Sequence, residues 1–135
     1  MDGVLWLGQA EELLATNFWD AVRAVNLEFE TRGLYISHLF CEDQVILNAD
    51  WKNRRVALPG SWRLLAAHRL GDADLLLSKL MRNDEADQQD ALFLCRITGL
   101  DREQVLSEIA SARVPPLPEL REEFEIASAR LLGRL

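Results

Sequence analysis

The chain has 135 residues, of which 49% are hydrophobic and 27% charged, and its formal net charge is -7. This size and composition are typical of one globular domain that can bury a core. The acidic balance argues against nucleic acid as a partner, because affinity for phosphate comes mainly from Lys and Arg. No apolar segment has the length of a membrane span, and two cysteines fit free thiols in the cytoplasm better than a disulfide scaffold. We therefore expect a cytoplasmic protein without a membrane segment.

The first part of the chain predicts a strand followed by a helix. Residues 4–7 form a short apolar run that ends at a glycine, which is typical of a buried strand. Residues 17–32 place apolar side chains at helical spacing, with Asn17 suited to the N-cap and Gly33 at the position after the helix. A central-looking strand so close to the first residue leads us to expect that further sequence normally precedes it.

The next part predicts β-structure. Segments 34–40, 44–47 and 54–58 are rich in strand formers and are separated by turn residues. Segment 62–70 fits a strand or a helix by periodicity alone. We assign it to a strand because Pro-Gly-Ser precedes it and a helix start follows.

The last part predicts four helices: 72–82, 85–97, 101–112 and one that begins near Pro118. Asp101 and Gln104 have the spacing of a capping box at the start of the third. The chain is therefore expected to be a single α+β domain over 1–135. A small mixed or antiparallel sheet of four or five strands with a packed helix would occupy 1–70, and a C-terminal helical subdomain 71–135.

The corner between the helices 72–82 and 85–97 concentrates charged side chains. Lys79 lies near the end of the first helix, and Asp87 and Asp90 are three residues apart in the second, so they share a helix face. A structural role accounts for them as well, because a lysine at a helix C-terminus and aspartates at an N-terminus complement the helix dipoles. Arg82 could pair with either carboxylate across the corner. The residues alone leave a vestigial site and a structural salt-bridge cluster both open.

The segment 74–80, the pair Arg82-Asn83 and the acids Asp87 and Asp90 resemble the C-terminal motif of the nucleotidyltransferase-like superfamily. That superfamily includes the AbiEii-type antitoxins and related uncharacterised bacterial domains. The resemblance implies a mixed sheet, paired carboxylates that hold Mg²⁺ against a triphosphate, and a helical Lys and Asp near the phosphates. It therefore implies catalytic roles for Lys79, Asp87 and Asp90, and a metal-binding role for Asp2, which matches the end of the acidic strand motif.

This chain departs from the superfamily at its beginning. The resemblance places the Gly-Ser loop and the first acid of the pair upstream of Asp2, where the printed sequence has only Met1. We therefore expect either a start codon that is assigned too late or a cut-down form of the domain. We expect a degenerate or truncated, antitoxin-like nucleotidyltransferase domain that is not catalytic and binds no cofactor; an active form would depend on Mg²⁺.

The alternative from another functional class is a non-catalytic module for protein–protein interaction or dimerisation. An uncovered N-terminal strand would leave a sheet edge and apolar surface free to pair with another chain. We therefore expect a homodimer, with the contact at residues 4–7 or at the helix after them, near Trp6 and Trp19. A different protein partner is the other possibility.

Overall fold

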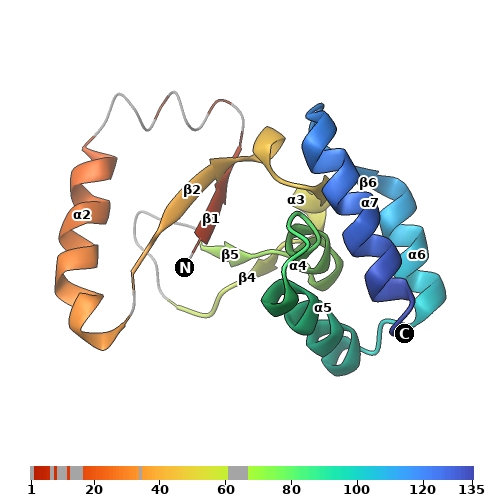
Figure 1. The fold of residues 1–135 in the computed structure, drawn as a ribbon. Coiled ribbons are helices and arrows are strands. Elements are labelled where there is room, and N and C mark those ends of the chain that lie inside the picture. Colours follow the sequence, from red (N-terminus) through yellow and green to blue (C-terminus); the bar gives the residue numbers. More distant parts are fainter. Residues whose placement is uncertain (1, 7, 9–11, 13–16, 34, 61–66) are drawn as a thin grey trace. The chain divides into compact units, whose positions relative to one another are not determined.

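The computed structural model describes residues 2–6, 8, 12, 17–33, 35–60 and 67–135 (Figure 1). The chain separates into two compact units, Met1–Val45 and Ile46–Leu135, here called the N-terminal and C-terminal units. The expected α+β class is confirmed. The described strands, however, form three separate two-stranded pairs instead of one sheet of four or five strands.

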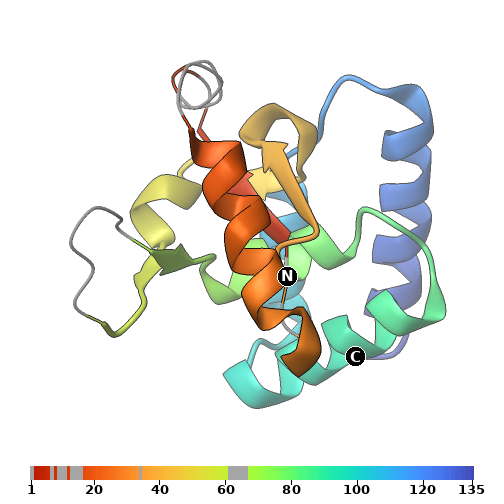
Figure 2. The same cartoon turned by 90° about the vertical axis from the view of Figure 1, so that its left-hand side faces the viewer.

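The N-terminal unit consists of one pair of parallel strands and one helix. Strand β1 (Asp2–Leu5) pairs with β2 (His38–Cys41), with Asp2 opposite His38 and Leu5 opposite Cys41. Helix α2 (Phe18–Phe29), drawn in orange in Figure 2, lies between them in sequence and continues into the 3₁₀ turn η1 (Glu30–Arg32). The chain leaves this turn through the left-handed conformation of Gly33, at φ 67°, as the sequence predicts.

Two of the strands expected in this region are shorter than predicted, because side chains bind the backbone groups that a strand would need. The amide group of Asn26 donates to the Ile36 carbonyl oxygen at 2.9 Å and accepts from the Ile36 N–H at 2.8 Å. Residues 35–37 are therefore outside the strand, and Leu34 is outside the described residues. Further on, the Gln44 side chain accepts from the Cys41 N–H at 2.9 Å, and this capping box makes the 3₁₀ turn η2 (Glu42–Gln44) where a strand was expected to begin.

The described part of the C-terminal unit, residues 46–60 and 67–135, contains short strands and five helices. Its elements are β3 (Leu47–Asn48), α3 (Trp51–Arg54), β4 (Val56–Ala57), β5 (His68–Arg69), α4 (Asp72–Lys79), α5 (Glu85–Thr98), α6 (Arg102–Ser111), β6 (Ala112–Arg113) and α7 (Pro118–Leu132). Strand β3 pairs antiparallel with β6, and β4 pairs antiparallel with β5. Of the expected strand 62–70, residues 62–66 are outside the described residues, and β5 is the part that the structure shows as a strand.

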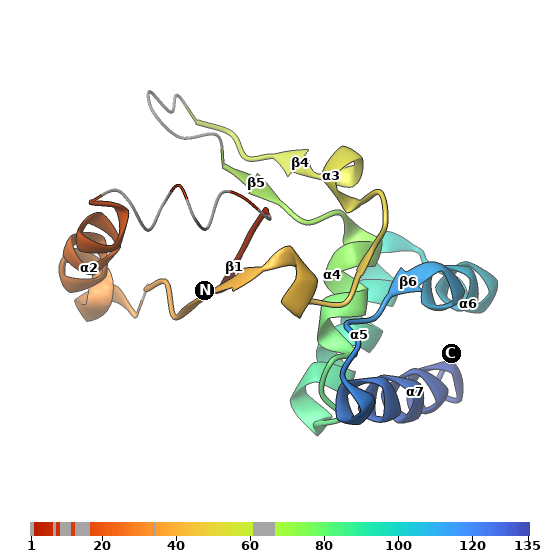
Figure 3. The ribbon, with the colours of Figure 1, turned by 90° about the horizontal axis from the view of Figure 1, so that it is seen from above.

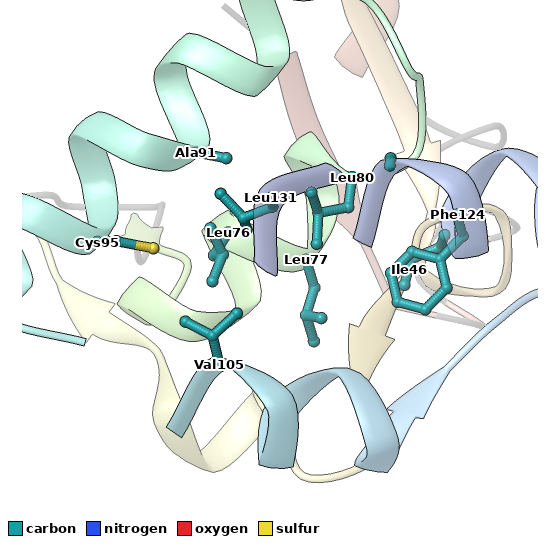
Figure 4. Packing of buried hydrophobic residues seen from close by; sticks show 10 residues of the cluster. Ile46, Leu76, Leu77, Leu80, Ala91, Cys95, Val105, Phe124 and Leu131 are labelled. Atoms are coloured by element: carbon teal, nitrogen blue, oxygen red, sulfur yellow. The ribbon is translucent and has the colours of Figure 1, made fainter. Parts of the chain in front are cut away.

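Helix α4 is at the centre of the C-terminal unit. It packs against β3, α5 and α6, while α7 packs against both α5 and α6 (Figure 3). Its side chains Leu76, Leu77 and Leu80 are fully buried, and they meet side chains from the surrounding helices in one core (Figure 4). The core consists of Ile46, Leu76, Leu77, Leu80, Ala91, Cys95, Val105, Phe124, Ala127 and Leu131. Burying a side chain of this size stabilises a fold by about 1.5–3 kcal/mol, so this unit contains its own source of stability.

Both cysteines are free thiols, one in each unit. Cys41 is half-buried in the N-terminal unit, and Cys95 is buried in the core of the C-terminal unit. Burial raises the pKa of the Cys95 thiol. Within the part of the chain that the structure describes, no helix has the length and apolar character needed to cross a membrane.

Candidate functional site

The α4–α5 corner brings together the three residues that the sequence singles out. Lys79 is the last residue of α4, and Asp87 and Asp90 lie in the first turns of α5. Helix α5 begins there because the Asp84 side chain accepts a hydrogen bond from the Asp87 N–H at 2.8 Å, which is a side-chain N-cap. Asp87 and Asp90 therefore lie three residues apart on one helix, as the sequence predicts.

The charged groups of the corner are paired with one another. The Lys79 ammonium lies 2.7 Å from Asp90 Oδ2 and 3.3 Å from Asp87 Oδ1. The Arg82 guanidinium lies 2.8 Å from Asp87 Oδ2. Each carboxylate oxygen of Asp87 thus has a cation beside it, and the arrangement matches the salt-bridge cluster that the sequence left open as an alternative.

The two aspartates differ in burial, and the difference is the reverse of what the sequence led us to expect. The Asp87 side chain is 7% exposed, whereas that of Asp90 is 58% exposed. From the sequence, the apolar neighbours Ala91 and Leu94 suggest that Asp90 is buried beside the lysine and that its loss costs more stability than loss of Asp87; the expected burial of Asp90 is wrong. The buried stripe of α5 runs through Asp87, Ala91 and Cys95 at helical spacing, and position 90 lies off that stripe.

The surroundings of Lys79 keep its side chain charged. Partial burial lowers the pKa of Lys79, but hydrogen bonds to Asp90 and Asp87 outweigh it and raise that pKa above 10.5. A lysine that acts as a base or nucleophile near neutral pH needs a lowered pKa. The arrangement therefore favours ion pairing over proton transfer at this side chain.

A shallow hollow lies beside the corner. It has a volume of about 240 Å³ and is lined by Leu75, Lys79, Asp90, Phe93 and Leu94. Ligand pockets for small molecules usually enclose about 300–1,000 Å³, so this hollow is small for a nucleotide. Phe93, on its wall, is 60% exposed.

The residue expected to bind metal belongs to the other unit. Asp2 lies in β1 of the N-terminal unit, opposite His38, whereas the corner belongs to the C-terminal unit. Among the residues that the structure describes, no group of three or more His, Cys, Asp or Glu side chains could hold a metal ion.

A second polar cluster, which sequence reasoning missed, connects four elements of the C-terminal unit. Arg54 of α3 makes two hydrogen bonds of 2.9 Å to the Glu108 carboxylate of α6. Asp74 of α4 is fully buried, with Oδ1 accepting from the Asn48 N–H of β3 at 2.8 Å and Oδ2 3.6 Å from Arg54 Nε. One signal was available in the sequence: Asp74 lies three residues before the apolar Leu77, so it shares the core-facing side of α4.

Electrostatics show how this cluster is held. The pKa of Asp74 is raised, and burial is the main cause. The hydrogen bond from Asn48 and the charge of Arg54 lower this pKa, but they do not outweigh burial. The hydrogen bonds to Glu108 are the main cause that raises the pKa of Arg54. Close packing adds to the constraint, because a Cβ atom on Gly71 would lie 2.7 Å from the Arg54 carbonyl oxygen. These contacts give the cluster a role in fixing β3, α3, α4 and α6.

A larger hollow lies in the N-terminal unit, between α2 and residues 35–39, and is here called the α2 groove. Its volume is about 500 Å³. The apolar residues on its walls are Trp19, Val22, Leu27, Tyr35, Ile36 and Leu39. Several of them are open to solvent: Trp19 is 40%, Tyr35 53% and Leu27 69% exposed.

Comparison of the chain with protein-family models, with curated proteins and with solved structures finds no match in any of the three.

Proposed function

We propose that this chain is a non-catalytic protein-interaction module that binds its partner through the α2 groove. The observation that carries the proposal is the burial of α2. None of the twelve residues of this helix, Phe18–Phe29, is buried. Phe18, Val22 and Phe29 on its apolar face are half-buried, and the apolar side chains of Trp19, Val25 and Leu27 are 40%, 45% and 69% exposed. An amphipathic helix normally buries that face against a core.

Two further features of the N-terminal unit support the proposal. An isolated helix shorter than about 12–15 residues is marginal in water, so α2 needs packing to be stable. Parallel strands occur almost only where both faces of the sheet are covered, yet the described part of the unit pairs only β1 with β2. An apolar surface that stays open in this way is typical of an interaction site.

The corner supports the non-catalytic part of the proposal. Lys79, Asp87 and Arg82 are engaged with one another, and the hydrogen bond from the Asp87 N–H to Asp84 starts α5. Holding α4 against α5 is a structural role that accounts for these charged residues without any catalytic one. Loss of the corner is therefore expected to affect stability and leave partner binding through α2 intact.

The test is a site-specific photo-crosslinker placed on the full chain in its own cells. We expect a crosslinker at Leu27, 69% exposed on α2, to give a discrete adduct. A matched crosslinker at Ile97, 61% exposed on α5, should give none. An adduct with twice the mass of the 15.4 kDa chain would identify the homodimer expected from the sequence. An adduct of any other mass would identify a different protein as the partner. No adduct, or the same adducts from both positions, would refute the proposal.

A degenerate, antitoxin-like nucleotidyltransferase domain is the second candidate, and the specific observation in its favour is that Lys79 and Asp90 line the same hollow. Calorimetry with ATP, GTP, CTP and UTP in the presence of Mg²⁺ tests whether a nucleotide site survives. We expect no heat of binding at millimolar nucleotide. A saturable isotherm that disappears in both Lys79→Ala and Asp2→Ala would favour an active enzyme over the interaction module.

A further inference from the structure

The charge of the chain is divided unequally between the two units. Residues 1–45 contain eight acidic and two basic residues, so they carry -6 of the formal net charge of -7. Residues 46–135 contain fourteen acidic and thirteen basic residues and are nearly neutral. The unit that contains the α2 groove is therefore strongly acidic.

The two arginines of the N-terminal unit have partners within it. Arg23 lies 3.2 Å from the Asp20 carboxylate, and the Arg32 guanidinium lies over the Phe29 ring, 5.3 Å from its centroid. Glu28 and Glu30, by contrast, are exposed and have no ion pair with any described residue. Glu30 also lines the α2 groove. The groove thus has an apolar wall, the ion-paired Arg23 and the unpaired negative charge of Glu30, while Glu28 lies outside its lining.

We infer that the occupant of the α2 groove is a basic amphipathic segment of another protein. The inference rests on the proposed function and specifies the chemistry of the partner. Apolar side chains of that segment would cover Trp19, Leu27 and Tyr35, while its Lys or Arg side chains would meet Glu28 and Glu30. Complementary charge of this kind accelerates association and selects among partners.

The same charges disfavour a second copy as the occupant. Two copies that met through their N-terminal units would bring together two surfaces of formal charge -6. Like charges placed against each other across an interface are unfavourable and exclude the wrong partner. This argument favours a different protein over the homodimer expected from the sequence.

The experiment measures binding of defined peptides to the purified full chain by calorimetry. The probe is a helical peptide with Leu on one face and Lys on the other, and the matched probe has Glu in place of Lys. We expect the Leu/Lys peptide to bind saturably and more weakly as salt is raised. A Leu/Lys peptide of the same composition but scrambled order should bind at least about tenfold more weakly, because it cannot present an apolar face.

Matched variants localise the contact. The double change Glu28→Lys and Glu30→Lys should weaken binding of the Leu/Lys peptide by about tenfold or more, because it reverses both unpaired charges. Glu122→Lys and Glu123→Lys, both exposed on α7, change the net charge by the same amount and should leave binding within about twofold. Leu27→Asp tests the apolar wall and should also weaken binding.

The outcomes separate this inference from the proposed function. Equal binding of the Leu/Glu peptide, or equal loss in the α7 variant, would overturn the inference. A crosslinked adduct at Leu27 with the mass of two chains would do the same, while it would support the interaction module. An adduct of another mass together with selective Leu/Lys binding would support both, and the absence of any adduct would refute the module itself.

Discussion

Helices α2 and α5 have similar lengths, twelve and fourteen residues, but they lie in very different surroundings. Helix α5 buries Asp87, Gln88, Ala91 and Cys95, whereas α2 buries none of its residues. Both sequences are amphipathic, so the pattern that predicts a helix does not report whether its apolar face is covered. The comparison shows that the C-terminal unit is held by its own core, whereas every residue of α2 in the N-terminal unit stays at least partly exposed.

The largest effect should come from removing core volume. Leu77 is fully buried in α4, and Leu77→Ala should lower the free energy of unfolding by about 2–5 kcal/mol. Leu27→Ala on α2, 69% exposed, should change it by less than about 0.5 kcal/mol. Urea denaturation of both variants measures the difference. Similar losses in the two would show that α2 is as well packed as α4.

The buried network of the C-terminal unit should be the next most sensitive feature. Arg54→Met removes the cation that lies between Asp74 and Glu108. Breaking a buried ion pair costs about 3–5 kcal/mol of stability. Because the Arg54 side chain is 26% exposed, we expect the free energy of unfolding to fall by about 2–3 kcal/mol at neutral pH. Arg121→Met, at an exposed position of α7, is the control and should have little effect. Equal stability of the two variants would show that the network is solvated.

The same variant has a predicted pH dependence. Burial raises the folded-state pKa of Asp74 above 3.8, so its charged form destabilises the fold at pH values above that raised pKa. As the pH falls through it, Asp74 becomes protonated in the folded state and the missing cation matters less. The difference between Arg54→Met and the parent should therefore shrink on acidification. A difference that grows instead would mean that Asp74 is not the group left unpaired.

The corner should show a smaller effect that separates its two aspartates. Asp87 is nearly buried between Lys79 and Arg82, so Asp87→Ala should cost about 1–3 kcal/mol. Asp90 is 58% exposed, so Asp90→Ala should cost about 0–1 kcal/mol. Denaturant titration gives both values. A greater loss for Asp90→Ala would restore the order first expected from the sequence.

The smallest effect compares the N-cap residues of two helices, one from each unit. Asp101 caps α6 by accepting from the Gln104 N–H at 2.8 Å, and Asp101→Ala should cost about 0.5–2 kcal/mol. Asn17 occupies the same position before α2 but makes no side-chain cap hydrogen bond, so Asn17→Ala should be nearly neutral. Thermal melts followed by circular dichroism test the pair. A clear loss from Asn17→Ala would show that α2 has a side-chain cap in solution.

Helices α4, α5, α6 and α7 of the C-terminal unit could be predicted from the sequence because their signals are local, whereas the short α3 was missed and its last residue was assigned to a strand. The capping box of Asp101, the glycine after α5 and the proline at the start of α7 all lie where the structure has them. The strands could not be predicted as well, because pairing depends on residues distant in the chain. Leu47 pairs with Arg113, and the Asn26 side chain takes the backbone groups of Ile36 that a strand would have used.

The sequence predicted which residues form the candidate site, but it did not predict which of them are buried. The spacing of Asp87 and Asp90 placed them on one face near Lys79, as the structure has them. Which of the two is buried depends on how α5 is rotated against α4 and α7, and that rotation is set by tertiary packing. The Arg54–Asp74–Glu108 network depends on three elements meeting, which no local pattern reports.

The position of the two cysteines gives the chain a built-in reporter for each unit. Cys41 is half-buried and belongs to the capping box of η2. Cys95 is buried in the core, and its thiol pKa is raised. A thiol-alkylating reagent should therefore react with the two cysteines at very different rates. The alkylation rate of the partly exposed Cys41 depends on its access to solvent in the N-terminal unit, and that of the buried Cys95 depends on opening of the C-terminal unit. Mass spectrometry of the unmodified protein can therefore time the two events separately, and a bound partner should slow labelling of Cys41 alone.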